Sequence, residues 1–235
     1  MSSDLLNYEI GGASFDMEVA SPKGPGPFPV VMVFHAWGGR DAFISEKLEK
    51  LAALGYIGAG VDLYGVGKRG SDIESSAALM TPLVENPDIL EKRIAAAFEQ
   101  AQGISGADSS KVAAIGYCFG GLCVTTAARQ GLPLKGVVSF HGLLNIPKIY
   151  DGDVTAKILL LHGQDDPMAG PDDIRNFAAE MKKMNAEWTL EAYPKTMHAF
   201  TNPVASDPDF GTVYNEAADK KSWNSMERFL REVFT

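Results

Sequence analysis

Short apolar runs alternate with helical patterns along almost the whole chain, and this alternation limits the possible folds more than any other feature. Continuous apolar runs such as Val30–Phe34 and Ile158–Leu161 are typical of strands buried on both faces of a sheet. Between these runs, apolar residues recur at the spacing of one face of a helix. Strands that alternate with helices predict βαβ units, and hence an α/β fold with a mostly parallel central sheet and helices on both faces.

The sequence predicts most element boundaries from the same patterns. Two runs separated by Gly11-Gly12 predict an N-terminal hairpin, Asp41 and Asp88 are candidate helix caps, and residues 202–210 are expected to form a loop. The expected strands cover residues 5–10, 14–20, 30–34, 57–61, 112–117, 137–140, 158–161 and 188–193. No repeat or linker divides the chain, so we expect one domain over residues 1–235.

Composition excludes several classes of function. The net charge of −9 argues against a nucleic-acid-binding surface, which needs clustered Lys and Arg. No apolar run reaches the length of a membrane span, and the segment Met1–Asp4 has no feature of a signal peptide. Cys118 and Cys123 are badly placed to bridge each other. We therefore expect a cytoplasmic protein that binds neither membranes nor nucleic acid, as a monomer or small homo-oligomer.

The segment Gly116-Tyr117-Cys118-Phe119-Gly120-Gly121 points to nucleophilic chemistry. It joins an expected strand to an expected helix, and the pattern Gly-x-Cys-x-Gly suits a sharp turn that exposes one side chain. Cys118 would then lie at a helix N-terminus, where the helix dipole favours the thiolate. Cys123, by contrast, is expected to be a small buried side chain.

A cysteine nucleophile needs a base and an acid that orients the base, and both follow later strands. His198 follows the expected strand 188–193, and Asp166 follows the expected strand 158–161. The order nucleophile, acid, histidine is that of the α/β-hydrolases. Cys118, Asp166 and His198 are therefore the predicted triad, with Asp165 as the competing acid.

The other histidines and the backbone donors complete the predicted site. His162 is expected to be structural, and His141 is a lesser candidate for the site. The oxyanion donors are predicted to be the backbone N–H groups of Phe119 and Trp37, with Ala36 as the alternative to Trp37. The histidines lack the paired spacing of a zinc site, so no metal is expected.

With these residues in place, the chain resembles the dienelactone hydrolase family from about Tyr8 to Phe234. The matching segments are 116–121, Asp62-Leu63-Tyr64, 162–167 and His198-Ala199-Phe200. The resemblance implies the α/β-hydrolase fold for the whole domain, and a cysteine-dependent esterase or lactonase that needs no cofactor. It also implies a substrate pocket, for which the candidate residues are His35, Ala36, Tyr64, Phe200 and Asn202.

Two positions depart from the family's pattern. Dienelactone hydrolases carry a glutamate where this chain has Ala36, and an arginine where it has Asn202. The missing arginine, which would bind a substrate carboxylate, favours neutral esters here. Arg40 and Arg69 are the alternative cations that could reach the site.

The triad leaves more than one activity open. The main expectation is hydrolysis of small-molecule carboxylic esters or lactones through a covalent intermediate. The same thiolate could attack a neutral phosphotriester without a metal. A non-catalytic binding protein on a hydrolase fold is the third alternative.

Overall fold

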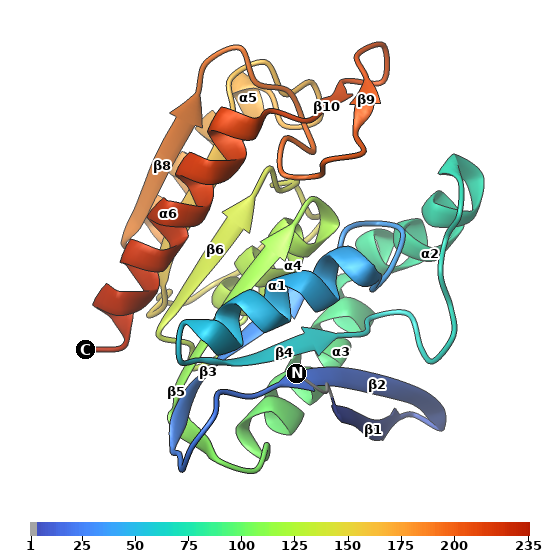
Figure 1. Ribbon diagram of the computed structural model, residues 1–235. Helices are drawn as coiled ribbons and strands as arrows, with labels where there is room; N and C mark the ends of the chain where they lie inside the picture. Colours follow the sequence, from blue (N-terminus) through green and yellow to red (C-terminus); the bar gives the residue numbers. More distant parts are fainter. Residues whose placement is uncertain (1–3) are drawn as a thin grey trace. The chain divides into compact units, whose positions relative to one another are not determined.

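The computed structural model describes residues 4–235, which divide into two compact units (Figure 1). Unit 1 holds residues 4–115 and 146–148, and unit 2 holds residues 116–145 and 149–235. One domain over residues 1–235 stays a prediction. Residues 1–3, which belong to the segment where we expect no signal peptide, lie outside the described residues. Across residues 4–235, no helix is both long and apolar enough to cross a bilayer.

Unit 1 contains strands in the order β1-β2-β4-β3-β5. Its elements are β1 (Asp4–Ile10), β2 (Ala13–Ala20), β3 (Phe28–Phe34), α1 (Ala42–Ala53), β4 (Ile57–Val61), α2 (Ile73–Glu85), α3 (Pro87–Gln102) and most of β5 (Ala107–Tyr117). The predicted hairpin is confirmed: β1 and β2 are antiparallel, and Gly11 and Gly12 both have positive φ angles in the turn. Strands β3 and β4 are parallel, and β3 carries five buried residues in a row.

Two helices of unit 1 differ from the expectation. Helix α3 begins at Pro87 after Asn86, so Asp88 lies in the first turn and is not the cap. Helix α2 was not predicted. Pro82 lies in its interior, and a proline inside a helical pattern is read in sequence as its end. Only Ser76 and Leu83 of this helix are buried.

Unit 2 contains the parallel strands β6, β7 and β8. Its elements are the end of β5, α4 (Phe119–Arg129), β6 (Gly136–Phe140), β7 (Lys157–Gly163), α5 (Pro171–Lys183), β8 (Trp188–Tyr193), β9 (Ser206–Asp207), β10 (Thr212–Val213) and α6 (Glu216–Val233). Helix α4 packs on β6, and α6 packs on β6 and β7 (Figure 1). The strand pairings in the two units confirm the predicted mostly parallel α/β architecture.

The segment expected to be a loop at residues 202–210 is partly ordered as a strand. Strand β9 lies within it and pairs antiparallel with β10. These strands have two residues each, which is too short for an alternating pattern to be visible in sequence.

Candidate functional site

Cys118 lies at a sharp turn between β5 and α4. Strand β5 ends at Tyr117, α4 begins at Phe119, and Cys118 between them has φ +56° and ψ −114°. A residue with a side chain rarely adopts this conformation, so neighbouring contacts must hold it. The Cys118 N–H donates to the Phe140 carbonyl at 3.0 Å, and the Cys118 carbonyl accepts from the Leu143 N–H at 3.3 Å. The backbone of Cys118 is thus fixed against the end of β6.

Gly116, the first residue of the Gly-x-Cys-x-Gly motif, and Gly121, which follows the motif, are required by close packing. A Cβ atom on Gly116 would overlap the backbone carbonyl of Gly120. A Cβ atom on Gly121 would overlap the Ser139 Oγ and the Gly142 Cα. Any side chain at either position would push the turn open, which explains why glycine stands at both.

Asp166 and His198 form a buried pair in unit 2. The His198 Nδ1 donates to the Asp166 Oδ2 at 2.8 Å, and both side chains are almost fully buried. The Met168 N–H donates to the other carboxylate oxygen, also at 2.8 Å. Asp165 is exposed, and its backbone N–H donates to the Thr196 carbonyl. Of the two candidate acids, Asp166 is the one that contacts the histidine.

Backbone contacts hold His198 in place. The His198 N–H donates to the Gly211 carbonyl at 3.0 Å, and the His198 carbonyl accepts from the Val213 N–H at 3.1 Å. Gly211 has φ +82°, and a Cβ atom there would overlap Pro167, the residue after Asp166. The segment around β10 therefore contacts the loop of the acid as well as the histidine.

Opposing effects set the protonation of His198. Burial lowers its pKa, but the charge that Cys118 carries as a thiolate and the hydrogen bond to Asp166 outweigh burial and raise the pKa to about 10. The His198 Nε2 is buried without a partner at hydrogen-bonding geometry among residues 4–235. We therefore attribute the effect of Cys118 to charge. With a pKa of about 10, His198 is an imidazolium at neutral pH.

Substituting Cys118 by Ala should lower the pKa of His198. The wild-type imidazolium should lose its proton near pH 10, and Cys118→Ala removes the negative charge that contributes to this high value. NMR titration of the His198 ring measures the midpoint in the wild type and in Cys118→Ala. In the wild type, the midpoint belongs to the coupled pair of His198 and Cys118. Cys123→Ala is the matched control and should leave the midpoint in place. An unchanged midpoint in Cys118→Ala would contradict the thiolate–imidazolium pair.

The two residues of unit 2 expected to line the substrate pocket have local partners. Phe200 is fully buried, with its ring centroid 5.5 Å from that of Tyr193. Asn202 is half-buried, and its side-chain oxygen accepts from the Val204 N–H at 3.3 Å. In these positions Phe200 supports the loop after His198, and the Asn202 side chain closes a local turn.

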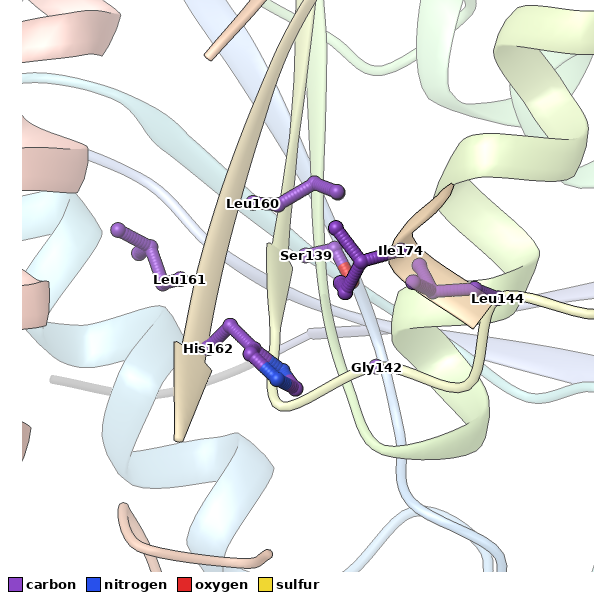
Figure 2. A pocket seen from close by; sticks show the side chains of 7 residues that line it. All are labelled: Ser139, Gly142, Leu144, Leu160, Leu161, His162 and Ile174. Atoms are coloured by element: carbon purple, nitrogen blue, oxygen red, sulfur yellow. The ribbon is translucent and has the colours of Figure 1, made fainter. Parts of the chain in front are cut away.

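A small hollow lies at the ends of β6 and β7 (Figure 2). It is lined by Ser139, Gly142, Leu144, Leu160, Leu161, His162 and Ile174. Its lining includes none of the predicted triad residues. His162 is half-buried there, and burial lowers its pKa. Within residues 4–235, no group of three or more His, Cys, Asp or Glu side chains is placed to hold a metal ion.

The remaining predicted residues, His35, Ala36, Trp37 and Tyr64, lie together in unit 1. His35 is fully buried, accepts from the Leu63 N–H at its Nε2, and lies 2.6 Å from the Ala36 carbonyl through its Nδ1. Burial lowers its pKa to about 4. The Tyr64 hydroxyl donates to the Trp37 carbonyl at 2.8 Å. These contacts order the loop after β3 and give His35 a scaffold role.

Arg40 and Arg69, the alternative cations, are paired within unit 1. Arg40 is mostly buried and forms ion pairs with Asp16 and with Glu18, the latter at 2.5 Å. Arg69 donates to the Arg40 carbonyl and lies 3.5 Å from the Asp62 carboxylate. Asp16 and Glu18 were not predicted as the partners of Arg40. They lie two residues apart on β2, so both side chains lie on the same face of the strand, and this spacing is visible in the sequence.

Comparisons with known proteins show which proteins this chain is similar to. The model of the dienelactone hydrolase family matches residues 15–234. Protein usf of Aquifex pyrophilus is 25% identical, over 98% of this chain and 99% of its own. A Salmonella typhimurium protein with the provisional name carboxymethylenebutenolidase is 26% identical, over 96% of this chain and 86% of its own. The crystal structure of a dienelactone hydrolase-like promiscuous phosphotriesterase from metagenomic libraries superimposes with a TM-score of 0.92 at 27% identity, over 100% of this chain and 99% of that one.

Proposed function

Because the chain belongs to the dienelactone hydrolase family, we propose that it hydrolyses carboxylic esters or lactones with Cys118 as the nucleophile. The observation that carries this proposal is the conformation of Cys118, held at φ +56° at the N-terminus of α4. A strained backbone that presents a thiol at a helix N-terminus is the arrangement a nucleophile needs. The His198–Asp166 pair in the same unit supplies the base and its orienting acid.

The first half of the reaction forms a thioester. The Cys118 Sγ attacks the carbonyl carbon of the ester, and the carbonyl oxygen takes the negative charge of a tetrahedral intermediate. Collapse of this intermediate breaks the bond to the alcohol oxygen. The His198 imidazolium gives its Nε2 proton to the departing alkoxide, and Asp166 keeps the ring oriented through its Nδ1.

The second half restores the enzyme. His198, now neutral, takes a proton from water, and the hydroxide adds to the thioester carbonyl. The carbon–sulfur bond then breaks and releases the carboxylic acid. The sulfur leaves as a thiolate, which is again paired with the imidazolium of His198.

Two backbone N–H groups are proposed to hold the oxyanion. Phe119 is the first residue of α4 and directly follows the nucleophile, which is the usual position of one donor. The second donor, at Trp37 with Ala36 as the alternative, lies in unit 1 and stays a prediction. Each such donor contributes about 10²–10³-fold to kcat in known acyl-transfer enzymes.

We expect neutral esters to be better substrates than matched esters that carry a carboxylate. A buried carboxylate needs a cation, and Arg40 and Arg69 already pair with carboxylates of unit 1. Ala36 and Asn202 carry no charge. The ratio of kcat/KM values should favour the neutral ester by about ten-fold or more, since an unpaired charge worth about 1.4 kcal/mol gives that factor.

Paired chromogenic esters with and without a carboxylate measure this preference. Asn202→Arg should narrow the gap if position 202 faces the substrate, and Asn202→Gln, which adds no charge, is its control. A wild-type preference for the anionic ester would contradict the inference and would mean that another residue, with Arg40 and Arg69 as the first candidates, supplies the cation.

Hydrolysis of neutral phosphotriesters is the second candidate activity. It is favoured by the similarity at 27% identity to a dienelactone hydrolase-like promiscuous phosphotriesterase. Here the Cys118 Sγ would attack phosphorus, the bond from phosphorus to the aryloxide would break, and the His198 imidazolium would give its proton to the departing oxygen. Water activated by His198 would then cleave the phosphorus–sulfur bond and restore the thiolate.

One panel of substrates tests both activities. Chromogenic acyl esters, lactones and neutral phosphotriesters are offered to the wild type and to Cys118→Ala. Turnover of esters or lactones that Cys118→Ala loses supports the main proposal, and loss of phosphotriester turnover in the same variant supports the second. A wild-type enzyme inactive on all three classes would contradict both.

A further inference from the structure

His141 lies directly behind the predicted catalytic histidine, in a conformation that needs support. It follows β6, is almost fully buried, and has φ +38°. Its N–H donates to the Leu161 carbonyl at 2.8 Å, which extends the pairing of β6 with β7 by one residue. A histidine held in the left-handed region at this depth is unusual, and such strain is concentrated at functional sites.

The His141 ring packs edge-on against two rings of the segment that carries His198. Its centroid lies 5.0 Å from that of His198 at 66°, and 5.1 Å from that of Phe200 at 80°. The Tyr117 ring lies at 6.1 Å. The His141 ring thus packs against one side of the His198 ring.

A hydrogen bond joins His141 to the same segment. Its Nε2 lies 2.8 Å from the Thr201 Oγ1, and both residues are buried. Thr201 is three residues after His198. The bond therefore connects the end of β6, where the Cys118 backbone is held, to the loop that presents the base.

His141 is neutral in this position beside His198. Burial keeps the pKa of His141 well below its usual value, and the positive charge of His198 lowers it further. The other titratable groups that act on the two rings are His162 on His141, and Cys118 and Asp166 on His198. A neutral His141 can contact the His198 imidazolium without charge repulsion.

We propose that His141 is a positioning residue, whose bond to Thr201 and edge-on contact fix the ring of His198 beside Cys118 for proton transfer to the leaving group and from water. This inference rests on the proposed function. His141 itself is not expected to touch substrate, because it is buried behind His198. Its effect should therefore act on kcat and on the titration of His198, with little change in KM.

The test removes the hydrogen bond from either side. His141→Phe keeps a ring but loses the bond, Thr201→Val keeps the shape but loses the hydroxyl, and Thr201→Ser keeps the bond. Both bond-breaking variants should lower kcat by about ten- to a hundred-fold, the range seen when an outer partner of a functional histidine is removed. The double variant should lose no more than the worse single one, since both remove the same interaction. Thr201→Ser should stay close to wild type.

Two further measurements separate positioning from a merely structural role and from failure of the proposed function. NMR titration of His198 and the alkylation rate of Cys118 at neutral pH need no substrate. Both bond-breaking variants should shift the His198 midpoint to lower pH and slow alkylation. Lower thermal stability with an unchanged His198 midpoint, or additive losses in the double variant, would overturn the proposal. If Cys118→Ala keeps full activity while the midpoint still shifts, the failure lies in the proposed function.

Discussion

Cys118→Ala should reduce ester hydrolysis by at least about 10⁴-fold, because removal of the nucleophile of a triad leaves only the oxyanion donors and substrate binding. Wild-type enzyme treated with a thiol alkylator should lose activity as one label appears on Cys118. Intact-mass measurement monitors the labelling. Cys123 should stay unlabelled at neutral pH, since it is fully buried and burial raises its pKa well above the usual value. Activity loss and single labelling should follow the same time course.

The matched control for this experiment is Cys123→Ala, which removes the other thiol of the chain. It should keep turnover and should still take one label. The folded state of both variants is compared by thermal unfolding. Near wild-type turnover in Cys118→Ala would show that another group is the nucleophile, and the mechanism would have to be rebuilt around it.

The positions of the buried strands along the chain and the turn at Cys118 could be predicted because local sequence determines both. Buried parallel strands appear as apolar runs, and the run Ile158–Leu161 corresponds to the buried part of β7. The turn was visible because Gly116 and Gly121 are needed for packing so close that no side chain fits. Local patterns of this kind do not depend on distant parts of the chain.

Features that depend on distant residues or on exposed surface could not be predicted in the same way. Helix α2 is largely exposed, and Pro82 in its interior interrupts the pattern that predicts a helix. The pairing of Arg40 with Asp16 and Glu18 joins positions 24 and 22 residues apart, and charge alone does not select such partners. The contact between His141 and Thr201 spans 60 residues and depends on the loop after β8. The sequence could nominate Arg40 and His141 but not the residues that they contact.

The choice between Asp165 and Asp166 shows where sequence reasoning stops for the site itself. Both are adjacent acids in one turn, and either could follow the strand at the right place. The backbone of the turn decides, because the Asp165 N–H donates to the Thr196 carbonyl and the Asp166 N–H donates to the Gly163 carbonyl. With the backbone so arranged, Asp166 is buried against His198 and Asp165 faces solvent.

Asp166→Asn should lower kcat by about 10³–10⁴-fold while the fold is kept, the range known for this change in a serine triad. The asparagine oxygen can still accept from the Met168 N–H, which directs the amide N–H₂ toward the His198 Nδ1. His198 would then have to present an unprotonated Nδ1 and carry its proton on Nε2, the wrong tautomer for a base. Loss of the carboxylate also removes one of the contributions that raise the pKa of His198.

Asp165→Asn is the matched control, since it makes the same chemical change one residue away on an exposed side chain. It should change kcat by less than about two-fold, because exposed substitutions away from the reacting groups have small effects. Ester hydrolysis at neutral pH, thermal unfolding and the NMR titration of His198 are measured for both variants. A large loss in Asp165→Asn with little loss in Asp166→Asn would assign the acid to Asp165. It would also require the turn after β7 to rearrange during catalysis, since Asp166 is the carboxylate in contact with His198.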